Sequence, residues 1–90
     1  MANTKTFQVT YDSDSDVLYI HYRKIPAARG IEDDEGVVWR YDSTGELIGV
    51  TVVDFESYWS GHRSQLARRI STGFNITDSQ AEVVLEHARS

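Results

Sequence analysis

The segment that most constrains the fold of this chain spans residues 36–54 and has the pattern of a β-hairpin. A β-branched and aromatic run at 37–41 is followed by a polar turn and then by a second apolar run at 47–53. The turn, Asp42-Ser-Thr-Gly45, is typical of a type I turn closed by a residue in the left-handed region. Asp42 can accept hydrogen bonds from the turn amides, and Gly45 can adopt a positive φ without a Cβ clash. We therefore expect two adjacent antiparallel strands here.

A similar hairpin is predicted closer to the N-terminus. Residues 6–11 alternate between apolar and polar side chains, which is typical of a half-buried strand. An acidic turn follows at 12–16, and residues 17–22 then form a second strand with apolar groups on both faces. Apolar groups on both faces indicate a strand that is central in its sheet or covered on each side.

The two hairpins together predict an α+β fold in which residues 6–55 form a four-stranded antiparallel meander. The tripeptide Tyr-Asp-Ser occurs at 11–13 and again at 41–43, which indicates weak repetition of one hairpin. The connector between the hairpins contains Pro26, the single proline of the chain. Farther along the connector, Ile31 marks either a short additional strand or a loop tucked under the sheet.

The C-terminal part of the chain, residues 57–90, has a helical pattern. Its apolar spacing predicts a first helix over 59–72, with Gly73 as the C-cap. Thr77-Asp-Ser-Gln80 fits a capping box and predicts a second helix over 78–88. We expect one or both helices of this extension to cover the apolar face of the sheet.

Composition limits the classes to which the protein can belong. Ninety residues suit one domain spanning 1–90, and the lack of cysteine excludes disulfides, thiol catalysis and cysteine-based zinc sites. A small domain without cross-links often gains stability by self-association, so we expect a homo-oligomer, with a dimer favoured. No apolar run approaches the roughly 18 residues of a membrane span, and the first residues lack a signal core. We therefore expect a cytoplasmic protein without membrane partners.

The negative charge of the chain is concentrated in one part of it. The net charge is −5, but residues 1–56 contain 5 Lys and Arg against 11 Asp and Glu. Residues 57–90 contain 4 Arg and 3 Asp and Glu. An acidic sheet argues against a nucleic-acid surface there and is compatible with a basic protein partner. Solubility alone also accounts for such a charge.

Two stretches of the chain resemble a known family. Tyr11-Asp-Ser-Asp-Ser-Asp-Val-Leu-Tyr-Ile20 is followed by Gly36-Val-Val-Trp-Arg-Tyr-Asp-Ser-Thr-Gly-Glu-Leu-Ile-Gly-Val50. In this order they resemble the small bacterial proteins of the domain of unknown function 2283 family, and the likeness covers about residues 7–55.

The resemblance implies a small β-rich fold and a prokaryotic or phage origin, and it carries over no catalytic residue. Some members of the family accompany small toxin-like proteins, which implies an antitoxin-like partner role. The chain departs from the family pattern in two places. Arg40 stands where the family usually has an acidic residue, and residues 57–90 extend beyond the family's usual end.

We predict no catalytic residue, no cofactor and no metal site. Asp12, Asp14 and Asp16 have the spacing of the first ligands of an EF-hand, but Val17 replaces the required glycine and Arg23 the bidentate glutamate. None of the histidines has a metal-ligand spacing; these are His21, His62 and His87. The carboxylates at 32–35 are predicted to lie in a loop without an apolar pocket that could raise a pKa.

The preferred interpretation is a non-catalytic protein–protein interaction or self-assembly module. Its partner is either a second copy of the chain or a basic or toxin-like protein. Five aromatic residues are candidate interface residues, since Tyr and Trp are enriched at interfaces, although in a domain this small most of the aromatics should be core: Tyr19, Tyr22, Trp39, Tyr58 and Trp59.

Two alternatives stay open. One is a ligand-binding protein or small enzyme with a cleft between the sheet and the C-terminal helices. The other is weak nucleic-acid binding through the basic run at 62–69, although the overall charge disfavours nucleic acid. The candidate basic contacts in this run are Arg63, Arg68 and Arg69.

Overall fold

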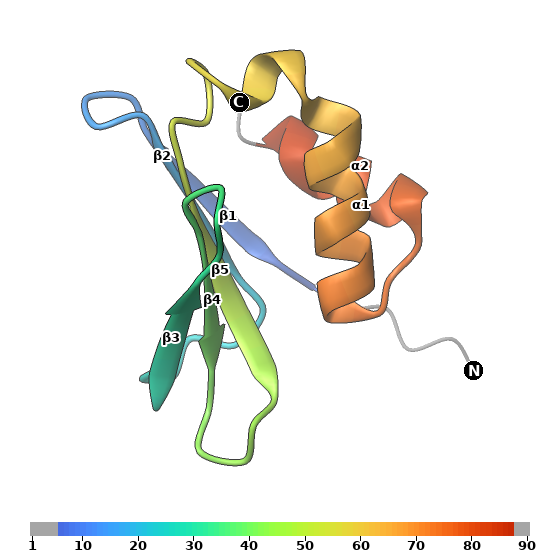
Figure 1. Cartoon of the computed structure of the whole chain (residues 1–90). Coiled ribbons are helices and arrows are strands. Elements are labelled where there is room, and N and C mark those ends of the chain that lie inside the picture. The colour runs from blue at the N-terminus through green and yellow to red at the C-terminus, as the bar shows by residue number, and fades with distance from the viewer. Residues whose placement is uncertain (1–5, 88–90) are drawn as a thin grey trace.

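The computed structural model describes residues 6–87 and has an α+β architecture, with a sheet on one side and helices on the other (Figure 1). The elements in chain order are β1 (Gln8–Asp12), β2 (Val17–His21), β3 (Arg29–Glu32), β4 (Val37–Tyr41), β5 (Leu47–Val53), the 3₁₀ turn η1 (Trp59–Gly61), α1 (Arg63–Phe74) and α2 (Asp78–Glu86). All strand pairings are antiparallel, and the strand order is β1-β2-β5-β4-β3. No helix within residues 6–87 is long and apolar enough to cross a membrane.

The prediction of a four-stranded meander is wrong in both strand number and strand order. The connector supplies a fifth strand, β3, which pairs with β4 at the edge of the sheet. In addition, β2 pairs with β5 and not with β4. The long connector lets the chain cross to the far edge and return, so that β5 becomes central. This order buries the most apolar strand, because residues 48–52 of β5 are all buried.

The turn between β4 and β5 has the predicted chemistry. Gly45 has φ 90° and donates its N–H to the carbonyl oxygen of Asp42 at 3.0 Å. The Asp42 carboxylate accepts the N–H groups of Thr44 and Glu46, each at 2.9 Å. A register shift after Arg40 pairs Tyr41 with Leu47. The hydrogen bonds that define this turn all join residues within five positions of one another, so the sequence was sufficient to predict them.

The first helix differs from its prediction at both ends. Residues 59–61 form the turn η1, and α1 begins at Arg63 and continues to Phe74. The C-cap is Asn75, which has φ 58° and donates its N–H to the Ser71 carbonyl, so the assignment of Gly73 as C-cap is wrong. Gly73 instead lies against the Trp39 ring. A Cβ at this position would be only 2.8 Å from Cζ3 of Trp39, so a larger residue would clash with the ring.

The second helix begins with the predicted capping box. The Thr77 hydroxyl accepts the Gln80 N–H at 3.1 Å, and the Gln80 side chain accepts the Thr77 N–H at 3.1 Å. The core lies between the helices and one face of the sheet. Its largest fully buried side chains are Trp59, Phe55, Leu18, Ile20, Leu66, Ile70 and Leu85.

Asp16 links the β1–β2 turn to the chain that follows β5. Its carboxylate accepts the Tyr11 hydroxyl at 2.7 Å and the N–H groups of Glu56 and Ser57 at 2.8 and 3.0 Å. The two amides that Asp16 binds lie about 40 residues later in the chain, so this contact is a tertiary one.

We expect the carboxyl group of Asp16 to titrate far below its ordinary pKa of 3.8. The Tyr11 hydrogen bond, followed by that of Glu56, lowers the pKa of Asp16 to about 2, and the same contact with Asp16 raises the pKa of Tyr11 to about 12. The resulting stabilisation is present above pH 3.8 and is lost as the pH falls toward 2. Carbon-detected NMR titration measures both pKa values. Tyr11→Phe should move the Asp16 pKa upward, and an unchanged value contradicts this explanation.

Candidate functional site

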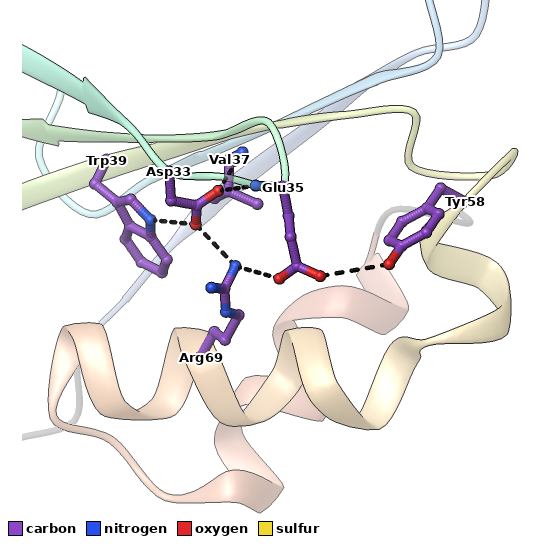
Figure 2. A network of polar contacts seen from close by, with 6 residues as sticks. All are labelled: Asp33, Glu35, Val37, Trp39, Tyr58 and Arg69. Carbon is purple, nitrogen blue, oxygen red and sulfur yellow. Dashed lines mark hydrogen bonds and ion pairs between the residues drawn. The ribbon is translucent and has the colours of Figure 1, made fainter.

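A polar cluster centred on Asp33 joins the β3–β4 turn to helix α1 (Figure 2). Oδ1 of Asp33 accepts the N–H groups of Glu35 and Val37 at 2.9 and 3.0 Å. Oδ2 accepts Nε1 of Trp39 at 3.1 Å and Nη1 of Arg69 at 2.8 Å. Two backbone amides, one indole and one guanidinium therefore share a single carboxylate.

Arg69 connects this carboxylate to a second one. Its Nη1 atom lies 2.9 Å from Oε1 of Glu35, and Oε2 of Glu35 is 3.4 Å from the Tyr58 hydroxyl. The Asp33 side chain is 21% exposed, while those of Arg69 and Glu35 are 36% and 37% exposed. The Asp33–Arg69 ion pair is thus better shielded from water than the contacts of Glu35 with Arg69 and Tyr58. Ion pairs as exposed as that of Glu35 contribute little to stability.

The surroundings of Asp33 keep its carboxyl group ionised. Partial burial acts to raise the pKa, but the hydrogen bonds from Trp39, Val37 and Glu35 and the charge of Arg69 outweigh it and hold the pKa below its usual value. An ionised carboxylate that already accepts four hydrogen bonds is suited to holding structure together. It is poorly suited to proton transfer at neutral pH.

The cluster borders an open groove of about 420 Å³ between β4 and α1. Trp39 and Tyr41 line it on the sheet side, and Arg68 and Arg69 of α1 line it on the helix side. One of the alternatives predicted from the sequence requires a cleft between the sheet and the C-terminal helices, and this groove lies between β4 and α1. Residues 6–87 contain no group of three or more side chains that could hold a metal ion.

Next to the groove, β3 forms an open edge of the sheet. Every residue from 23 to 32 is exposed, and Ile31 is 47% exposed. Asp33 donates its N–H to the Val37 carbonyl at 2.9 Å. Because opposed pairs alternate in an antiparallel ladder, Ile31 also exchanges hydrogen bonds with its partner Trp39. The backbone groups of Gly30 and Glu32 therefore point away from β4, toward solvent.

The five candidate interface aromatics do not form one surface. Trp59 is fully buried in the core, so its placement at an interface is wrong. Tyr22 packs against Phe7 and Phe74. Tyr58 is 41% exposed and stacks on His62. Trp39 lines the groove beside α1. Tyr19 lies apart from all of them, in a pocket with His21 and Arg40 on the opposite face of the sheet.

The three candidate basic residues are also separated. Arg63 lies over the Phe55 ring, with its guanidinium carbon 5.7 Å from the ring centroid. Arg68 borders the groove, and Arg69 is neutralised by Asp33 and Glu35. Because one charge is already paired and another lies on a different side of the helix, this arrangement offers little continuous positive surface for nucleic acid.

Sequence reasoning missed the centre of this site. The sequence predicts only that the carboxylates at 32–35 lie in a loop without an apolar pocket, whereas Asp33 binds a residue that lies 36 positions later in the chain. The local signal was the Asp-Asp-Glu-Gly pattern, in which an aspartate accepts amides two and four residues ahead, as Asp33 does. Nothing in the sequence pattern pointed to Arg69 as its partner.

Comparison with known proteins found one related family. A family model described as a protein of unknown function (DUF2283) matches residues 8–55, which confirms the resemblance drawn from the sequence. That segment contains all five strands and Asp33, whereas Arg69 lies beyond it. No curated protein and no solved structure matches the chain.

Proposed function

This chain belongs to the DUF2283 family, whose description names no activity, and we propose from its geometry that it is a non-catalytic self-assembly module. Two copies pair through their β3 edges and form one continuous antiparallel sheet. The observation that carries this proposal is the open edge itself, where the backbone groups of Gly30 and Glu32 point away from β4 beside the exposed Ile31. Such an edge is a template for another strand.

The charges favour β3 over β1, the other edge strand of the sheet, as the strand that pairs with a second copy. Arg29 and Glu32 give β3 opposite charges at its two ends, so a second antiparallel copy meets no like-charge repulsion. In β1, antiparallel pairing about the central Thr10 would set Gln8 against Asp12, so no opposite charges within the strand would meet. The charges therefore favour self-pairing at β3.

The Asp33 cluster prepares β3 for assembly. A four-residue strand paired on one side only is weakly ordered by itself. The hydrogen bonds from Asp33 to the turn amides and to Arg69 fix the β3–β4 turn against α1. Ordering the edge before association lowers the entropy cost of binding. Because so small an edge buries little area, we expect a dissociation constant on the order of micromolar.

Replacing Ile31 with lysine tests the proposal. Sedimentation velocity over a series spanning about 1 µM to 1 mM should show a concentration-dependent dimer for the unmodified chain. Ile31→Lys should shift it to monomer, because the charge would be buried at the new strand pair. Val83→Lys is the matched control, since Val83 on α2 is 51% exposed and lies outside β3. A monomer at every concentration overturns the proposal.

Partners other than a second copy are outcomes of the same experiment. A heterologous strand, for example from a basic or toxin-like protein, could occupy the same edge, and a complex of unequal chains would then replace the homodimer. The cytoplasmic location and the antitoxin-like role stay predictions from the sequence.

A further inference from the structure

Symmetry restricts how two β3 strands can meet. An edge-to-edge antiparallel pair of identical strands has a two-fold axis perpendicular to the sheet, and directly opposed residues share a face. The axis must then pass through a residue and not between two residues. Near the middle of β3 this leaves two registers, with the axis at Gly30 or at Ile31. With the axis at Ile31, the outward backbone groups of Gly30 and Glu32 bond to each other across the pair. With the axis at Gly30, Glu32 would face Ala28, whose N–H already donates to the Tyr41 carbonyl at 2.8 Å.

Charge distinguishes the two registers on the face that carries the helices. With the axis at Ile31, this side chain meets Ile31 of the partner subunit, and Arg29 stands opposite Asp33 of the partner subunit. With the axis at Gly30, Arg29 stands opposite an isoleucine on this face, and Glu32 stands opposite an alanine on the other face. Only the first register joins apolar with apolar and positive with negative.

The opposite face of the sheet also favours the register with the axis at Ile31. With the axis at Ile31, Glu32 of the partner subunit stands opposite Gly30, and Gly30 stands opposite Arg40 within the chain. The three residues form one row across the strands. Gly30 has no side chain to separate the two charges, and Nη1 of Arg40 lies 3.9 Å from the position that a Cβ at Gly30 would take. The guanidinium therefore already reaches toward the open edge.

Neither Arg40 nor Glu32 has an ion-pair partner among the described residues of its own chain. Ion pairs within residues 6–87 join Arg23 to Glu46 and Arg69 to Asp33 and Glu35, and none involves Arg40 or Glu32. Arg40 donates Nε to the Thr51 hydroxyl at 3.1 Å, which orients its guanidinium. Adjacent strands are about 4.8 Å apart, so a glutamate one strand beyond Gly30 is within reach of it.

The face around Arg40 is also locally positive in a protein whose net charge is −5. Partial burial lowers the pKa of His21, and the charges of Lys24 and Arg40 lower it further. A carboxylate arriving from outside the chain would be attracted to this region.

We infer that β3 pairs with its own copy about a two-fold axis at Ile31, and that Glu32 of the partner subunit forms an ion pair with Arg40 across Gly30. This rests on the proposed function, because it requires two β3 edges to meet. It adds the register and the residues that make the edge specific for a second copy of this chain.

Two charge-reversal variants test the ion pair. Glu32→Arg and Arg40→Glu should each weaken the homodimer, because each homodimer then contains two like-charge contacts. An equimolar mixture of the two variants should recover a heterodimer, since both of its contacts are attractive again. We expect each single variant to lose at least about tenfold in affinity, equal to about 1.4 kcal/mol, and the mixture to recover most of it. Arg63→Glu is the control, because Arg63 lies over the Phe55 ring, away from the row, and its reversal should change the affinity little.

Cross-linking tests the axis independently of charge. The chain contains no cysteine, so Ile31→Cys introduces its single thiol. A non-hydrogen-bonded antiparallel pair sets Cα atoms about 4.5 Å apart, which suits a disulfide. Mild oxidation should therefore link Ile31→Cys chains much faster than Arg29→Cys chains. Circular dichroism of every variant checks that its fold is retained.

The outcomes separate the two proposals. If the unmodified chain dimerises but the mixed variants do not recover binding and Ile31→Cys does not cross-link preferentially, the register is wrong while assembly through β3 stands. If the unmodified chain is monomeric throughout, both proposals fall.

Discussion

Replacing Asp33 with alanine is expected to lower the free energy of unfolding by about 2–4 kcal/mol. The substitution leaves the N–H groups of Glu35 and Val37, the indole of Trp39 and the charge of Arg69 without their shared acceptor. Urea denaturation followed by tryptophan fluorescence measures the change. Because the same contacts hold the β3–β4 turn, the variant should also dimerise less than the unmodified chain.

Glu35→Gln is the matched control for Asp33→Ala. Glu35 also contacts Arg69, but its side chain is 37% exposed, so we expect a cost below about 1 kcal/mol. Equal losses in the two variants would show that Asp33 is no more than a surface partner of Arg69. The pH dependence gives a second check. Because the pKa of Asp33 is below its ordinary value of 3.8, its stabilisation is present above that pH and is lost as the pH falls further.

Trp59→Ala is expected to lower the free energy of unfolding by about 3–5 kcal/mol. Trp59 is 0% exposed and lies where η1 meets the core, so alanine leaves a large cavity. Trp59→Phe should cost clearly less, because the indole Nε1 is buried without a hydrogen-bond partner among residues 6–87. Phenylalanine removes that desolvated N–H while it keeps most of the apolar contact.

Thermal and urea unfolding of both Trp59 variants measures this difference. Tyr58→Ala serves as the neighbouring control. Because Tyr58 is 41% exposed, this substitution should lower the free energy of unfolding much less than Trp59→Ala does. If Trp59→Phe proved as destabilising as Trp59→Ala, the cost would come from the lost indole and not from the cavity.

These two sites show where prediction from sequence ends. Trp39 and Trp59 look equivalent in the sequence, since both are aromatic residues beside apolar runs. One is half-buried in a groove and hydrogen-bonded to Asp33, while the other is sealed in the core. The sequence likewise predicted Gly73 as the C-cap of the first helix, whereas the structure has Asn75 there. Only the position of the Trp39 ring explains why glycine stands at 73.

The sequence by itself determined the features that depend on contacts within about five residues. These are the Asp42–Gly45 turn, the capping box at Thr77, the apolar faces of β1 and β2, and the helical character of the C-terminal part. The tertiary structure decided the strand order, the existence of β3 and the tie between Asp33 and Arg69. Each of these depends on which distant segments meet. That choice is made by burying the most apolar strand at the centre of the sheet, a property of the whole chain and not of any short pattern.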